Sequence, residues 1–166
     1  MSTITMGGNP VHTAGELPKV GSQAPDFRLT DTELNDFQLS DLKGSKVILN
    51  IFPSIGTGVC SASVRRFNQE ASDMENTKVV CVSKDLPFAH KQFCGAEGIT
   101  NVISASQYKD HSFSEAYNVD LLDGKFEGLM SRAIVVLDEN GKVVYTEQVP
   151  EIGQEPNYEK AKAAVC

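Results

Sequence analysis

The sequence predicts an α/β fold with a central mixed sheet flanked by helices. Residues 47–52 and 78–83 contain continuous apolar runs, which are typical of strands covered on both faces. A helical pattern lies between them, and a β-α-β unit of this kind makes its two strands parallel. Residues 133–137 and 142–145 enclose an Asp-Glu-Asn-Gly turn, which indicates an antiparallel hairpin. Parallel and antiparallel pairs together make the sheet mixed.

Length and composition fit one globular domain over residues 1–166. Hydrophobic residues make up 40% of the chain and charged residues 22%, and the length allows a sizeable core. The net charge is −7 at pH 7. Nucleic acids and anionic membranes both favour a basic patch, so we expect neither as a partner.

Targeting signals are absent from the sequence as given. No apolar run approaches the roughly 18 residues of a membrane-spanning helix. The first eight residues lack the basic start and apolar core of a secretory signal. We therefore expect a cytoplasmic protein.

The N-terminal third predicts short strands. Residues 4–6 and 11–13 flank Gly7-Gly8-Asn9-Pro10, which indicates a small hairpin. Residues 27–30 and 36–39 alternate in polarity like short, half-exposed strands. Ser40 can cap a short turn that Gly44 ends.

The helix after the first buried strand has one apolar face. Its apolar or small residues follow steps of four and three, at Cys60, Val64, Phe67, Ala71 and Met74. A second helix begins at Asp85-Leu86-Pro87, with proline in its first turn. We expect it to end at Phe93-Cys94-Gly95, with Gly95 as the stop.

The remaining elements complete the order of a known fold. Beyond the second helix we expect a short strand, a short helix, the hairpin described above and a closing helix, at residues 102–103, 112–117, 133–145 and 158–165. A β-α-β unit followed by a β-β-α unit is thioredoxin-like. The N-terminal hairpin is an addition to it.

The four cysteines indicate redox chemistry or metal binding rather than a structural framework. No C-x-x-C pair occurs among Cys60, Cys81, Cys94 and Cys166. Four cysteines are also too few to form a disulfide framework for a chain of this length. Cys81 lies within an apolar strand and is expected to be structural. Cys166 is the last residue, and we expect no catalytic role for it. His90 and Cys94 are four apart on one helix face, but two ligands do not make a zinc site.

Cys60 stands where a helix begins, directly after the turn that starts at Pro53. Helix N-termini carry unpaired N–H groups and a partial positive charge, which favour a thiolate. An ordinary thiol is only ~3% thiolate at neutral pH, and reaching ~90% takes roughly 3.4 kcal/mol. A helix end supplies about 0.3–1 kcal/mol and at most about 2. A fixed cation or charge-assisted hydrogen bonds must therefore contribute.

Three other residues can complete a thiolate site. Thr57 is one turn before Cys60 and can point its hydroxyl at the sulfur. Pro53 stiffens the turn and can shield it from water. Arg132, which stands between Ser131 and an apolar strand, is the best candidate for the cation.

The spacing Pro53-x-x-x-Thr57-x-x-Cys60 resembles the active-site motif of the peroxiredoxins, and longer segments are similar to their thiol peroxidase branch, the atypical 2-Cys type. These segments are residues 50–68, 85–89, 93–98 and 132–136, together with Gly8-Asn9-Pro10-Val11 near the N-terminus. The resemblance spans nearly the whole chain. One departure is Gly56, where the family usually has aspartate.

The resemblance implies a thiol-specific peroxidase that reduces hydrogen peroxide and alkyl hydroperoxides. It makes Cys60 the peroxidatic cysteine, which becomes a sulfenic acid, and Cys94 the resolving cysteine of an intramolecular disulfide. Thr57, Arg132 and Pro53 would surround the thiolate. It further implies thioredoxin as the reductant, a homodimer, and no metal, haem, flavin or other cofactor.

Plainer interpretations stand beside these. Cys60 can be a buried small hydrophobe, Cys94 a packing residue and Arg132 a surface residue at a strand start. Phe52, Phe88, Phe93 and Tyr117 are expected to be core residues more often than a substrate pocket. A redox-sensing interaction protein, a thiol–disulfide oxidoreductase and a small zinc protein are the competing functions.

Overall fold

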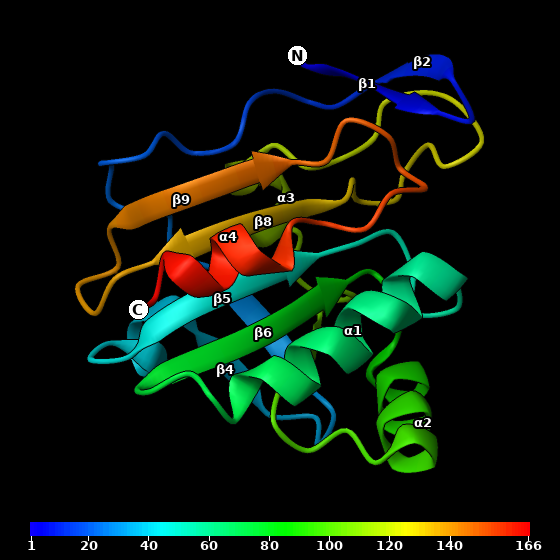
Figure 1. Ribbon diagram of the computed structural model, residues 1–166. Coiled ribbons are helices and arrows are strands. Elements are labelled where there is room, and N and C mark those ends of the chain that lie inside the picture. Colours follow the sequence, from blue (N-terminus) through cyan, green and yellow to red (C-terminus); the bar gives the residue numbers. More distant parts are fainter.

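A seven-stranded mixed sheet forms the centre of the computed structural model, which describes residues 1–166 (Figure 1). Its strands lie in the order β4-β3-β7-β6-β5-β8-β9. Their bounds are β3 Arg28–Asp31, β4 Asp36–Gln38, β5 Lys46–Ile51, β6 Thr77–Ser83, β7 Ile103–Ser106, β8 Ala133–Leu137 and β9 Val143–Gln148. A separate antiparallel hairpin joins β1 (Thr3–Met6) to β2 (Asn9–His12). The predicted mixed sheet and N-terminal hairpin are thus confirmed.

The central strand β5 has a parallel and an antiparallel neighbour. Ile48 pairs in register with Val79 of β6, which runs parallel, and with Val136 of β8, which runs antiparallel. Helix α1 (Gly58–Ala71) connects β5 to β6, as the β-α-β pattern predicted. Ile51 pairs with Ala133, so the end of β5 and the start of β8 lie at the same edge of the sheet.

Helices cover both faces of the sheet. Figure 1 shows α1 and α4 (Tyr158–Ala163) on one face and α3 (Ser112–Tyr117) behind the other, while α2 (Pro87–Glu97) lies beyond the ends of β5 and β6. Alternate residues of β5 enter separate cores, with Ile48 on the α1 side and Leu49 on the α3 side. This alternation explains why Val47, Ile48, Leu49 and Ile51 of β5 are all apolar, although neighbouring residues face opposite sides of the sheet. None of the helices has the length and hydrophobicity that a membrane crossing requires.

Helix α2 is longer than the sequence predicted. It continues through Gly95 to Glu97, and Gly98 ends it in a left-handed conformation at φ 67°. The Gly98 N–H donates to the Cys94 carbonyl, which closes the last turn. The expected stop at Gly95 was wrong because Gly98, three residues later, takes the left-handed conformation. Cys94 consequently lies inside the helix.

Two smaller expectations were also wrong. The short helix at Leu39–Leu42 begins after Gln38, which serves as its N-cap in place of Ser40. Phe88 is 64% exposed, whereas Phe52 and Tyr117 are fully buried as expected. Pro87 and His90 mark the buried face of α2. Phe88, one residue after Pro87, is turned about 100° away from it.

The buried alternation of β5 makes a direct prediction about stability. Leu49→Ala should lower the free energy of unfolding by about 2–5 kcal/mol, because it leaves a cavity under a fully buried side chain. Leu122→Ala, at a position that is 46% exposed, should change it by less than about 0.5 kcal/mol. Chemical denaturation of both variants measures the difference. Equal losses of unfolding free energy in the two variants would contradict the burial of Leu49.

Candidate active site

Cys60 is held at the first turn of α1. Thr57 is the N-cap of this helix, and its hydroxyl oxygen accepts a hydrogen bond from the Cys60 N–H at 3.2 Å. Pro53, at the other end of the turn, is buried. The Cys60 side chain therefore lies at the positive end of the helix dipole. Because the Thr57 oxygen is engaged by the cap, its expected contact with the sulfur stays a prediction.

Arg132 provides the cation at this turn. Its Nη1 and Nη2 atoms each lie 3.4 Å from Cys60 Sγ, although the two residues are 72 apart in the chain. Cys60 is 0% exposed and Arg132 2% exposed. A guanidinium with two donors directed at one sulfur favours the thiolate, and the low dielectric of a buried site strengthens that interaction.

Hydrogen bonds to the segment after β9 and to β9 itself hold Arg132 in place. Its Nε donates to the Ile152 carbonyl at 2.8 Å. The Arg132 carbonyl accepts from the Val149 N–H and from the Gln148 side chain, each at 3.0 Å. These bonds orient the planar group, so that both of its terminal nitrogens face the sulfur.

The segment that holds Arg132 is itself held by the N-terminal hairpin. The Ile152 N–H donates to the Thr5 carbonyl at 2.9 Å. The Glu151 carboxylate accepts from the N–H groups of Gly153, Gly8 and Gly7. These bonds, with that of Gly153 the strongest, lower the pKa of Glu151 to about 2. The hairpin therefore supports the segment that positions Arg132, a role that nothing in the sequence pattern signalled.

Asp85 fixes the loop between β5 and α1. Its carboxylate accepts from the Ser54 hydroxyl at 2.8 Å and from the Ile55 N–H at 2.7 Å. The Ile55 carbonyl in turn accepts from the Ser61 hydroxyl at 2.8 Å. Sequence reasoning missed this role of Asp85, which it had placed only at the start of the second helix.

Gly56 lies within this loop and is exposed. A Cβ atom there would meet only the Ser54 hydroxyl, at 3.5 Å, which is an ordinary contact. Its φ is not positive, so the backbone does not require glycine at this position. The loop therefore has room for the aspartate that the family usually carries.

Cys94 lies on α2 and is half-buried. Its sulfur is 3.3 Å from the Ser104 hydroxyl of β7. All four cysteines are free thiols, so no disulfide joins Cys60 to Cys94 in this structure. Arg65 of α1 holds the same end of α2, through an ion pair with Glu97 and a cation–π contact with the Phe93 ring at 5.5 Å.

Cys81 shows what burial does to a thiol without a cation. It is fully buried on β6, and its nearest polar partner is the Asn50 amide, 3.6 Å from the sulfur. Burial raises the pKa of Cys81 to about 12, so this thiol stays protonated and unreactive. Its predicted structural role fits this environment.

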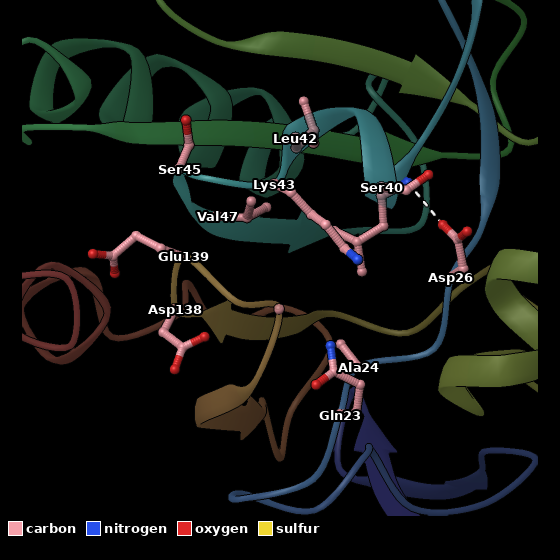
Figure 2. Close-up of a pocket in the computed structure, with 12 residues that line it drawn as sticks. Gln23, Ala24, Asp26, Ser40, Leu42, Lys43, Ser45, Val47, Asp138 and Glu139 are labelled. Carbon is pink, nitrogen blue, oxygen red and sulfur yellow. Dashed lines mark hydrogen bonds between the residues drawn. The ribbon is translucent and has the colours of Figure 1, made fainter.

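One cavity is remote from Cys60. It has a volume of about 200 Å³ and is lined by apolar residues, such as Leu42, and by polar and charged ones, including Gln23, Asp26, Lys43, Asp138 and Glu139 (Figure 2). These residues gather where β5 begins and β8 ends, whereas Cys60 follows the opposite end of β5. No group of three or more His, Cys, Asp or Glu side chains is placed to hold a metal ion.

Comparisons with known sequences agree with these features. A family model described as Redoxin matches residues 19–162. Thiol peroxidases of Mycobacterium bovis and Mycobacterium tuberculosis are each 54% identical to the chain over 165 residues, which is 99% of this chain and 99% of theirs.

Comparisons with solved structures confirm the thioredoxin-like fold. A peroxiredoxin-like protein from Aquifex aeolicus superposes with a TM-score of 0.94 at 36% identity, over 99% of this chain and 96% of that one. A thiol peroxidase from Chromobacterium violaceum superposes with a TM-score of 0.89, over 97% of this chain and 93% of that one. It is 18% identical, so this second likeness concerns the fold alone.

The contact between Arg132 and Cys60 predicts the reactivity of the thiol. Arg132→Ala should slow alkylation of Cys60 at neutral pH by about tenfold or more, because charge-assisted hydrogen bonds contribute about 1.5–3 kcal/mol. The measurement is the alkylation rate against pH, followed by peptide mass spectrometry, which separates thiolate formation from access to the sulfur. Arg28→Ala removes an arginine that pairs with Asp36 on the surface and should leave the profile unchanged. An unchanged profile in Arg132→Ala would remove Arg132 from the site.

Proposed function

The chain belongs to the Redoxin family and, within it, to the thiol peroxidases, and we propose from this premise that Cys60 is the peroxidatic cysteine of a thiol-specific peroxidase. The observation that carries the proposal is the pair of Arg132 donors at 3.4 Å from Cys60 Sγ in a buried site. Peroxidases of this class need a thiolate as the nucleophile. Only Cys60 among the four cysteines has a cation directed at its sulfur.

In the first step, the Cys60 thiolate attacks the nearer oxygen of a hydroperoxide. A sulfur–oxygen bond forms and the O–O bond breaks, so cysteine is oxidised to a sulfenic acid and the peroxide is reduced. The leaving oxygen takes up a proton and departs as water or an alcohol. The Arg132 donors, and the Thr57 hydroxyl if it turns from its cap, stabilise the negative charge as it passes from sulfur to oxygen. Pro53 helps to shield the site from water.

In the second step, the Cys94 thiolate attacks the Cys60 sulfenic sulfur. A disulfide forms and the hydroxyl of the sulfenic acid leaves as water after protonation. A disulfide needs its two Cα atoms within about 7 Å. Cys94 lies inside α2, so we propose that the C-terminal part of this helix unwinds in this step and that the Arg65 contacts to Phe93 and Glu97 break.

A dithiol reductant then returns both cysteines to the thiol form by disulfide exchange. We propose thioredoxin for this role, and hydrogen peroxide and alkyl hydroperoxides as substrates, in a cytoplasmic homodimer of single-domain subunits. The exposed side chains of Leu86 and Phe88 stand directly after Asp85, which holds the active-site loop. They offer apolar surface for a protein partner next to the site.

Replacing the proposed peroxidatic cysteine should abolish turnover. Cys60→Ser removes the only nucleophile placed against Arg132, so peroxide-dependent NADPH consumption with thioredoxin and thioredoxin reductase should fall to the background rate. Cys166→Ser changes an exposed thiol and should retain full activity. Substantial turnover by Cys60→Ser would refute the assignment of Cys60.

Replacing the proposed resolving cysteine should separate the two steps. Cys94→Ser should consume about one equivalent of peroxide per subunit and then stall, because the sulfenic acid forms but no disulfide follows. Stopped-flow measurement of peroxide consumption, with trapping of the sulfenic acid by dimedone, reads out the stall. Normal cycling with thioredoxin would show that Cys94 is not the resolver. If Cys94→Ser stalls but the oxidised wild-type protein contains no Cys60–Cys94 disulfide, a different thiol is the resolver.

A further inference from the structure

A buried chain of hydrogen bonds lies behind the active-site loop and takes no part in the steps above. It consists of His90 on α2, Ser83 at the end of β6 and Asp85 just after that strand, with Ser83 bonded to both of the others. Ser83 Oγ lies 2.9 Å from His90 Nε2 and 2.5 Å from Asp85 Oδ2. It also accepts from the Asp85 N–H at 3.1 Å. His90 is 1% exposed and Ser83 is fully buried.

The donors and acceptors in this chain can be assigned by counting hydrogens. A serine hydroxyl has one hydrogen and two lone pairs. The Asp85 carboxylate accepts at both oxygens from Ser54 and Ile55, so it acts as an ionised acceptor, and the Ser83 hydrogen points to it. The Ser83 oxygen then accepts from the Asp85 N–H and from His90. His90 must therefore carry its hydrogen on Nε2.

This assignment leaves the other ring nitrogen of His90 without a partner. Nδ1 is buried and makes no hydrogen bond. In the Nε2–H tautomer it presents a bare lone pair, and a proton added there would find no acceptor. The Phe52 ring packs edge-on against the imidazole, with 6.2 Å between the ring centroids. The pocket thus accepts the neutral ring and excludes the charged one.

This chain of hydrogen bonds links the two segments that carry the proposed reactive cysteines. At one end, Asp85 holds the Ser54–Ile55 part of the loop that leads to Cys60. At the other end, His90 is one helical turn before Cys94 on α2. Serine stands in the middle, and its hydrogen is committed to the carboxylate, so the trio cannot act as a serine nucleophile with a histidine base.

We propose that His90 is a positioning residue of the peroxidase reaction, which holds Asp85 and the active-site loop in place through Ser83 while its ring is neutral. Protonation of Nδ1 expels the ring from its pocket, and this release loosens the loop. The proposal rests on the proposed role of Cys60. It also assigns the N-terminal part of α2 a fixed role, so that unwinding is confined to the part that follows His90.

The direction of the pH effect follows from the groups around the ring. Asp85 is the charged group that acts on His90, and it favours the protonated ring, whereas burial disfavours it more strongly and lowers the pKa of His90 below the usual 6.5. Ser83 and Phe52, on the neighbouring strand ends, are uncharged neighbours of the ring. The unfolded chain takes up the proton at the ordinary pKa. His90 therefore stabilises the fold above pH 6.5, and this contribution is lost as the pH falls below it.

Nitrogen-15 spectra of the histidine rings in the reduced wild-type protein test the assignment without any assay of activity. His12→Asn and His111→Asn identify the signals of the other two histidines. We expect His90 to be neutral with its hydrogen on Nε2 at pH 7. We also expect the Ile55 amide signal to titrate together with the His90 ring as the pH is lowered. An Nδ1–H tautomer, or an Ile55 amide that does not follow His90, would overturn the proposal.

Two substitutions test the consequence for the reaction. In the Cys94→Ser background, which isolates the peroxide step, His90→Leu removes the donor and should slow that step about tenfold at pH 7.5. His90→Gln keeps an N–H donor without a titratable ring. It should retain the rate within about threefold, and its Ile55 amide should not shift with pH between 7 and 5.

The outcomes separate this proposal from the function on which it rests. If the Cys94→Ser protein consumes no peroxide, then the proposed function fails, while the ring spectra still decide the tautomer. If the Cys94→Ser protein consumes peroxide and adding His90→Leu does not slow this step, then the positioning role is refuted. If His90→Leu does not fold, His90→Gln carries the kinetic test. A loss of rate in His90→Gln as large as that of Cys60→Ser would contradict the proposal, because this variant keeps the N–H donor.

Discussion

The candidate active site of this protein depends on a buried cation facing a buried sulfur. A guanidinium is costly to bury without a partner, and Arg132 is 2% exposed. Each of its three guanidinium nitrogens has a partner: Nε donates to the Ile152 carbonyl, and Nη1 and Nη2 donate to the Cys60 sulfur. The pairing of β5 with β8 makes this possible, because Ile51 opposite Ala133 brings the turn after one strand beside the residue before the other. The active site is therefore a consequence of strand register.

The same site must be rigid for one step of the proposed reaction and mobile for the next. Asp85 and the Thr57 cap fix the turn at Cys60, whereas the proposed second step requires Cys94 to leave its helix and reach Cys60. Helix α2 fits both demands, since its buried residues, Pro87 and His90, lie in its first half. The second half is held by the Arg65 contacts, by the left-handed Gly98 and by the partial burial of Phe93 and Cys94. Exposed ion pairs contribute little to stability, so this is the half that the proposed disulfide step would unwind at the lower cost.

The sequence predicted those features of the fold and the site that depend on local residue patterns. The β-α-β unit, the helix that begins at Cys60 and the need for a distant cation all follow from spacing and from elementary energies. The end of α2 did not, because Gly95 and Gly98 are both suitable stops and only the folded backbone decides between them. Glu151, Asp85 and His90 were also missed as supporting residues. Their partners are backbone N–H groups and a serine hydroxyl from other segments, which have no sequence signature.

Burial alone does not decide what a cysteine does in this fold. Cys60 and Cys81 are both 0% exposed, and both lie in the same core on the α1 side of the sheet. Next to Cys81 the polar neighbour is an amide, whose hydrogen bond opposes burial without outweighing it, so the thiol is retained. Next to Cys60 there are a helix N-terminus and two guanidinium donors, which act against burial. The surroundings of the two thiols thus differ by a helix N-terminus and by one arginine, which the N-terminal hairpin and the segment after β9 keep in place.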